Sequence, residues 1–80
     1  MNIQLLFFGI TQDLVGTHQM EMNLEESISV ATLKTIIFQQ FPNLKRFPNF
    51  EIAVNEQYAT DDVVVHNRDI VAIIPPVSGG

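Results

Sequence analysis

The chain has 80 residues and 46% of them are hydrophobic, which suits one small domain built around a single core. Nine acidic residues against four basic ones give a formal net charge of −5, which argues against nucleic acid or an anionic membrane as the partner and favours a basic protein surface. No cysteine is present, so disulfides, thiolate nucleophiles and cysteine-ligated metals are excluded. With no signal-like segment and no apolar stretch near the roughly 20 residues that span a bilayer, we expect a soluble cytoplasmic protein.

Two strands joined by a short helical segment are expected at the N-terminal end. Residues Ile3–Phe8 alternate as in a strand, and Thr17–Leu24 alternate more cleanly, as in a half-buried strand paired with the first. The connection 9–16 is long for a tight hairpin and predicts a helical turn around Gln12–Val15. His18 shares the apolar register of its strand, so we expect a core or rim histidine.

One main helix is expected in the middle of the chain. Ser29 is a suitable N-cap, and Pro42 ends the helix. Leu44 and Phe47 are expected to pack beneath the loop Pro42–Pro48. The apolar positions of the helix recur at helical spacing: Val30, Leu33, Ile37 and Phe41.

The C-terminal half is expected to form strands. Phe50–Val54 and Gln57–Ala59 flank Asn55-Glu56 as a short hairpin, and the apolar run Ile70–Ile74 suits a central strand. The order of elements predicts an α+β domain over residues 1–74, with a mixed sheet of four to five strands and one main helix on one face.

A single helix leaves the opposite face of the sheet without cover. Leu6 or Phe8, together with Tyr58 and Ile74, contributes apolar area to that face. Two interpretations remain open, namely ordinary exposure of scattered apolar residues and a docking site for a partner.

The C-terminal end carries the most specific motif, an extended tail over residues 75–80 that follows the last strand without a linker. Proline lacks a backbone donor and fixes φ, so the tail is expected to project from the domain, and the two glycines give a tip that fits a narrow channel. An inert terminus is the alternative. The tail consists of Pro75, Pro76, Val77, Ser78, Gly79 and Gly80.

The chain offers poor materials for catalysis of its own. His18 and His66 lie in no metal-ligand motif, and Ser78 has no neighbouring base. The acidic pairs Glu25-Glu26 and Asp61-Asp62 diverge in extended structure and indicate solvated turns or a helix entry rather than a catalytic dyad. We therefore expect no catalytic residue and no metal site, so any chemistry at this chain would be catalysed by another protein.

Several motifs, in order along the whole chain, resemble the small, sulfur-carrying subunit of molybdopterin synthase, a ubiquitin-like β-grasp family. The motifs are Leu5-Leu6-Phe7-Phe8-Gly9, Asp13-Leu14-Val15-Gly16, Ala53-Val54-Asn55-Glu56 and the run from Asp69 to Gly80. The resemblance implies that an ATP-dependent activating enzyme adenylates the Gly80 carboxylate and that a sulfur donor enzyme converts it to a thiocarboxylate. The tail would then enter the catalytic large subunit, in a heterotetramer, and give sulfur to a cyclic pterin precursor to form the dithiolene. No cofactor would be bound permanently.

By position, the resemblance places the partner interface on Phe8, Tyr58 and Ile74. Two positions depart from the family pattern, with Gln12 where an arginine is frequent and Arg68 where a glycine is usual, and Asn67 is expected to take up any left-handed turn there. Three alternatives stay open: a sulfur carrier of the thiamine pathway, a ubiquitin-like modifier that joins Gly80 to lysines, and an interaction domain with an inert tail.

Overall fold

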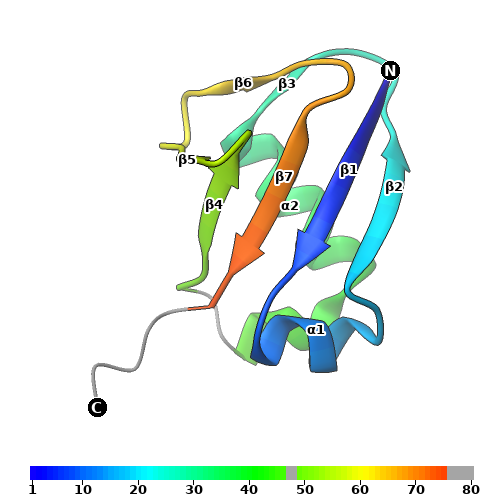
Figure 1. Ribbon diagram of the computed structural model, residues 1–80, viewed down its shortest axis with the longest axis vertical. Helices are drawn as coiled ribbons and strands as arrows, with labels where there is room; N and C mark the ends of the chain where they lie inside the picture. The colour runs from blue at the N-terminus through cyan, green and yellow to red at the C-terminus, as the bar shows by residue number, and fades with distance from the viewer. Residues whose placement is uncertain (47–48, 76–80) are drawn as a thin grey trace.

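The computed structural model describes residues 1–46 and 49–75, and it contains a five-stranded mixed sheet (Figure 1). The strand order is β2-β1-β7-β4-β5, in which β1 and β7 are parallel and the other neighbours are antiparallel. The central position of β7 confirms the prediction made from its apolar run. The strands are β1 (Asn2–Phe7), β2 (Gln19–Asn23), β4 (Glu51–Val54), β5 (Gln57–Tyr58) and β7 (Ile70–Ile74).

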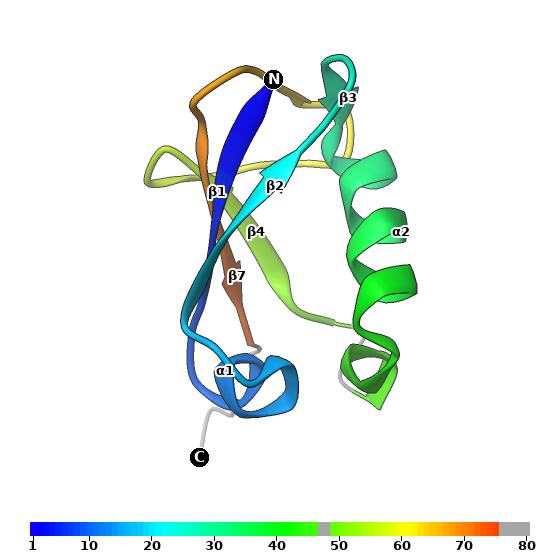
Figure 2. The same ribbon diagram turned by 90° about the vertical axis from the view of Figure 1, so that its right-hand side faces the viewer.

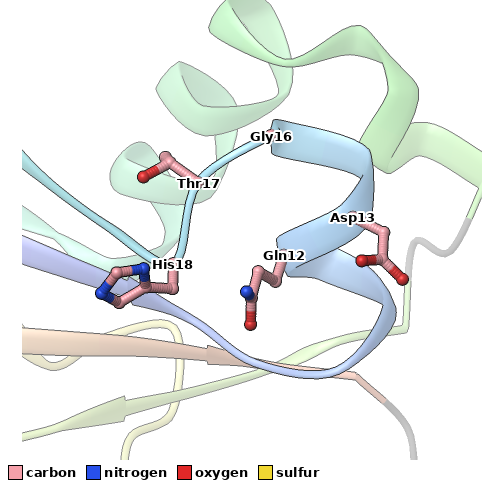
Figure 3. Close-up of a pocket in the computed structure, with 5 residues that line it drawn as sticks. All are labelled: Gln12, Asp13, Gly16, Thr17 and His18. Carbon is pink, nitrogen blue, oxygen red and sulfur yellow. The ribbon is translucent and has the colours of Figure 1, made fainter.

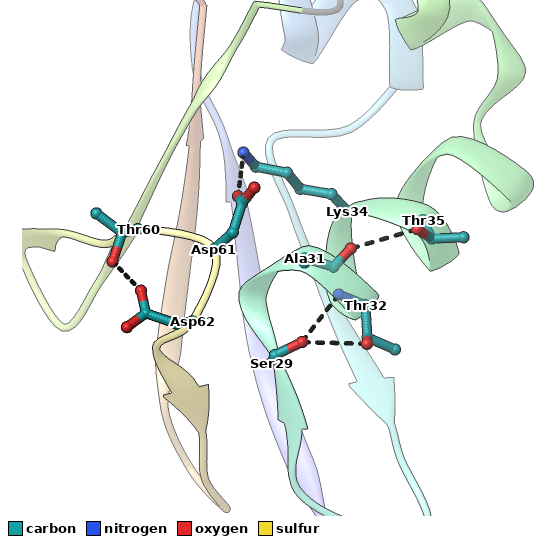
Figure 4. A network of polar contacts seen from close by, with 8 residues as sticks. All are labelled: Ser29, Ala31, Thr32, Lys34, Thr35, Thr60, Asp61 and Asp62. Atoms are coloured by element: carbon teal, nitrogen blue, oxygen red, sulfur yellow. Dashed lines mark hydrogen bonds and ion pairs between the residues drawn. The ribbon is translucent and has the colours of Figure 1, made fainter.

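One long helix, α2 (Val30–Gln40), packs across one face of this sheet (Figure 2). Ser29 caps it as predicted, because its side-chain oxygen accepts a hydrogen bond from the Thr32 N–H at 3.2 Å. Lys34 reaches from the helix to the Asp61 carboxylate at 2.9 Å and ties the helix to the loop beside it (Figure 4). The predicted α+β architecture with one main helix is therefore confirmed.

The core lies between α2 and the sheet. Phe7 meets Phe41 edge to face with ring centroids 5.7 Å apart, which joins β1 to the end of the helix. The predicted loop after the helix is instead a 3₁₀ helix, η1 (Pro42–Arg46), and it does bury Leu44 as expected. The expected packing of Phe47 lies outside the described residues. The fully buried apolar side chains include Leu5, Leu33, Ile37, Leu44, Val65, Val71 and Ile73.

A second, two-stranded sheet was not predicted. It pairs β3 (Ile28–Ser29) with β6 (Val64–Val65) in antiparallel fashion and buries Val65 completely. Each strand has only two residues, which is too short for alternation to show in the sequence.

Two turns use left-handed backbone. Asn55 and Glu56 have φ of 50° and 71°, as a tight two-residue hairpin requires, and this confirms the predicted β4–β5 hairpin. Before β7 the left-handed residue is Arg68, with φ of 72°, so the expectation for Asn67 is wrong. Asn67 instead uses its side-chain oxygen to accept the Asn2 N–H at 2.8 Å. The turn thus places its positive φ one residue later.

Candidate functional site: the open face of the sheet and the root of the tail

The sheet face opposite α2 carries no helix in the part of the chain that the structure describes (Figure 2). Strand alternation decides which side chains lie there. In β1, Ile3, Leu5 and Phe7 are buried against the helix, so Leu6 and the following Phe8 point to the opposite side. We call this side the open face.

Strand register places the predicted interface residues on this face. Leu6 pairs with Ala72, Ala72 with Ala53, and Ala53 with Tyr58, so these four side chains form one row across the sheet. Ile74 lies two residues beyond Ala72 and shares its face. The structure therefore brings Phe8, Tyr58 and Ile74 to the same side of one sheet.

An apolar hollow of about 410 Å³ lies on the open face. Phe8 lines it, whereas Tyr58 and Ile74 lie on the same face outside its wall. Two residues of β7, Ile70 and Ala72, also line the hollow, and sequence reasoning did not single them out. The alternation Ile70, Ala72, Ile74 carries the signal for them. The lining consists of Leu6, Phe8, Asn55, Glu56, Ile70 and Ala72.

Three large apolar side chains are exposed on this face, Phe8, Tyr58 and Ile70, whereas Ile10, Val63 and Val64 are exposed elsewhere on the domain. Tyr58 is 72% exposed and Phe8 is 47% exposed, while Ile74 is half-buried. Large apolar side chains grouped around an apolar hollow are typical of protein interaction sites rather than of scattered exposure. The geometry favours docking of a partner over the alternative.

The C-terminal tail begins at the end of this face. The Phe8 N–H donates to the Ile73 carbonyl at 3.2 Å, which is the last β1–β7 hydrogen bond before Pro75. Proline has no N–H and cannot extend the ladder in the same way. Pro75 is described, whereas Pro76, Val77, Ser78, Gly79 and Gly80 lie outside the described residues.

A second, polar hollow of about 400 Å³ lies where α1 (Ile10–Val15) meets β2. This helix confirms the predicted helical turn. Figure 3 shows the Asp13 carboxylate and the His18 imidazole on either side of Gln12, not turned toward each other. His18 is exposed, so it is not a core histidine; it lies at the rim, just before the first residue of the edge strand β2.

Acid–base chemistry has little support among residues 1–46 and 49–75. No group of three or more histidine or acidic residues could hold a metal there. Asp61 is paired with Lys34, and hydrogen bonding by the Thr60 hydroxyl and the backbone of Asp62 lowers the pKa of the exposed Asp62 carboxyl. Within the same residues no helix has the length and apolarity to cross a membrane.

A mixed five-stranded sheet with one main helix packed across one face defines a ubiquitin-like β-grasp domain. Solved structures agree. Molybdopterin converting factor subunit 1 from Pyrococcus furiosus superposes with a TM-score of 0.86 at 25% identity, over 95% of this chain and 98% of that one. At lower identity, small archaeal modifier protein 1 from Haloferax volcanii (TM-score 0.85, 18%) covers the whole of both chains and shows the shared fold.

The family follows from the sequence comparisons. The chain belongs to the ThiS family, whose profile matches residues 5–80. The molybdopterin synthase sulfur carrier subunit of Arabidopsis thaliana is 31% identical over all of this chain and 84% of the relative. The subunit of the same name from Drosophila erecta is 30% identical over all of this chain and 92% of the relative. The resemblance found in the sequence is thus confirmed.

Proposed function

We propose that this protein is a sulfur carrier in molybdenum cofactor biosynthesis and that Gly80 carries the sulfur. The relatives of similar length are named sulfur carrier subunits of molybdopterin synthase, and the ThiS match extends through the C-terminal Gly79-Gly80. The observation that carries the proposal is the continuity of the buried central strand β7 with the tail, beside an apolar face suited to a partner.

The tail chemistry requires activation. A free α-carboxylate has a pKa of about 3.3–3.7, so at neutral pH it is an anion and a poor electrophile. Attack of the Gly80 carboxylate on the α-phosphate of ATP gives an acyl adenylate and releases pyrophosphate. A sulfide-equivalent donor then attacks the carbonyl carbon, AMP leaves, and a thiocarboxylate remains. The sulfur of this thiocarboxylate attacks the cyclic pterin precursor, and hydrolysis of the resulting thioester leaves the sulfur on the pterin and returns the Gly80 carboxylate.

The chain supplies the carrier and its partners supply the catalysis. An ATP-dependent activating enzyme performs adenylation, a sulfur donor enzyme provides the sulfur, and the large subunit of molybdopterin synthase provides the catalytic residues, in a heterotetramer. Phe8, Tyr58 and Ile74 dock the large subunit through the open face, which places the tail root at the edge of the contact. A solved complex of subunits 1 and 2 of molybdopterin-converting factor from Helicobacter pylori contains a chain of the same fold (TM-score 0.70, 22% identity).

Intact-protein mass spectrometry tests the carrier chemistry. The full chain and a chain lacking Gly80 are each incubated with activating enzyme, ATP and a sulfur source. We expect replacement of one oxygen by sulfur in the full chain alone. Lys34→Met, which removes an ion pair on the helix side, serves as the matched control and loads like the full chain. An unchanged mass with an enzyme that is active on its own carrier would refute the proposal.

The molecule that reacts with Gly80 distinguishes a sulfur carrier for molybdopterin from a protein modifier. The loaded chain is mixed with the large subunit and the cyclic pterin precursor, and dithiolene formation is followed. We expect product from the loaded chain and none from the unloaded one. Stable amide conjugates between Gly80 and lysines in place of dithiolene would instead identify a modifier.

A further inference from the structure

The root of the tail is held by α1. Thr11 is fully buried, and its hydroxyl lies 2.5 Å from the Phe8 carbonyl oxygen and 3.3 Å from the Ile73 carbonyl oxygen. A hydroxyl has one proton to donate, so Phe8 is its main acceptor and Ile73 lies within its reach. The same Ile73 carbonyl also accepts the Phe8 N–H. Thr11 therefore lies against the last hydrogen bond that fixes β7 before the tail.

Gly9 sets the path of the chain directly after β7. Its backbone has φ of 54° and ψ of −134°, a combination that residues other than glycine rarely adopt. A Cβ built on Gly9 would lie 2.9 Å from the Pro75 Cγ, closer than real Cβ contacts occur. Only a residue without a side chain lets Pro75 take the position that it has.

We propose that Gly9 and Thr11 are positioning residues that aim the C-terminal tail. Thr11 holds the Phe8 carbonyl in the turn that follows β1 and lies within reach of the Ile73 carbonyl, and Gly9 leaves the space that Pro75 occupies. Because proline fixes φ, a rotation at this root changes the direction in which the chain leaves Pro75. The inference rests on the proposed function, in which Gly80 must reach a partner's active site.

Binding of the domain to a partner and placement of the tail for reaction depend on different residues. The Thr11 hydroxyl contacts only the backbone carbonyls of Phe8 and Ile73, so Thr11→Val changes none of the side chains of the open face. We expect a carrier with a misplaced tail to bind the activating enzyme with unchanged affinity and to react slowly. A misplacement of about 1 Å at a reacting group can cost up to about 100-fold in rate.

The test is the steady-state rate of pyrophosphate release by the activating enzyme at varied concentrations of carrier, with a saturating sulfur source that discharges the acyl adenylate. Thr11→Val removes the hydroxyl and keeps the shape, and Gly9→Ala introduces the clash. We expect kcat to fall about 10- to 100-fold in both variants with KM for the carrier unchanged. Thr11→Ser restores the hydroxyl and is expected to restore kcat.

Gly16 supplies the matched control. It also has positive φ, 90°, at the other end of α1, but a Cβ there meets nothing within 4 Å. Gly16→Ala therefore carries backbone strain without a contact to the tail, and we expect its kcat to stay at the level of the unmodified chain. Equal losses of kcat in Gly16→Ala and Gly9→Ala, or an unchanged kcat in Thr11→Val, would overturn the positioning role.

A measurement without any enzyme separates this inference from the proposed function. The nuclear Overhauser effect between the Gly9 Hα protons and the Pro75 ring reports the packing of the tail root. We expect it in the unmodified chain and in Thr11→Ser, and we expect it to weaken in Thr11→Val. If the effect keeps its full strength in Thr11→Val, the positioning role of Thr11 is refuted. This conclusion does not depend on whether the chain carries sulfur. Failure of the unmodified chain to react with the activating enzyme would instead refute the proposed function.

Discussion

Phe7 and Phe8 are neighbours in sequence whose side chains point to opposite faces of the sheet, and this pair offers a sharp test of the open face. Phe7 is 2% exposed and belongs to the core, whereas Phe8 is 47% exposed and lines the apolar hollow. Phe8→Ala is expected to weaken binding of the large subunit with little loss of stability. Phe7→Ala is expected to destabilise the domain.

The magnitudes follow from exposure. A phenylalanine side chain has roughly 200 Å² of surface, so about 90 Å² of Phe8 remains to be buried by a partner. At about 25 cal/mol per Å² this area contributes at most about 2 kcal/mol, which is an upper limit of about 30-fold in Kd. Removal of the buried Phe7 ring costs about 3–5 kcal/mol of folding free energy, and each kcal/mol lowers Tm by about 4–8 °C in a domain of this size.

Calorimetric titration with the large subunit measures Kd, and thermal unfolding measures stability. Val64→Ala is the matched control, because Val64 is 45% exposed but lies on β6 in the second sheet. We expect its Kd to be unchanged. A Phe8→Ala variant that binds like the unmodified chain, or that unfolds as readily as Phe7→Ala, would refute the assignment of the open face as the docking surface.

Three further predictions concern local structure. Ser29→Ala removes the α2 cap and is expected to cost about 1 kcal/mol of unfolding free energy in denaturant titrations, whereas Ser29→Asp should retain most of it. Arg68→Gly relieves a left-handed backbone and is expected to stabilise the domain by up to about 1 kcal/mol; a lower Tm would contradict this. The lowered pKa of Asp62 means that its contribution to stability is present above the ordinary carboxyl pKa of about 3.9 and is lost as pH falls through the lower, folded value. Thr60→Ala should raise the pKa of Asp62 in a carboxyl NMR titration, and an unmoved titration curve would exclude the hydroxyl as its cause.

Much of the fold could be predicted because local patterns agree with the final packing. The capped apolar periodicity of α2 and the apolar run of β7 each specify one burial environment, and the structure confirms both. The second sheet escaped prediction because its strands have two residues each, and their pairing depends on a contact between distant segments. His18 lies in the apolar register of its strand, yet the structure leaves it exposed. Alternation alone does not show at which residue the covered part of a strand ends.

The site was predictable in part for the same reason. The uncovered face pointed to Leu6 or Phe8, with Tyr58 and Ile74, and family position pointed to Phe8, Tyr58 and Ile74. The rows that join these residues depend on strand register, which a sequence read alone does not provide. The contact of the Thr11 hydroxyl with the root of the tail was not predicted. A threonine in a predicted helical turn carries no signal that its hydroxyl will meet the carbonyls of two different segments.

The parallel pairing of β1 with β7 bears on how the two proposed partners would recognise this chain. Parallel strands end at the same edge of a sheet, so Phe8 and the root of the tail are brought together at the end of the open face. In the proposed function the tail enters each partner's active site, so the surface that adjoins the tail is the part of the domain nearest to either partner. If the activating enzyme and the large subunit both use this face, they compete for it, and release from the first must precede docking with the second. Phe8→Ala should then weaken both complexes, whereas an effect confined to one of them would mean that the two enzymes recognise different surfaces.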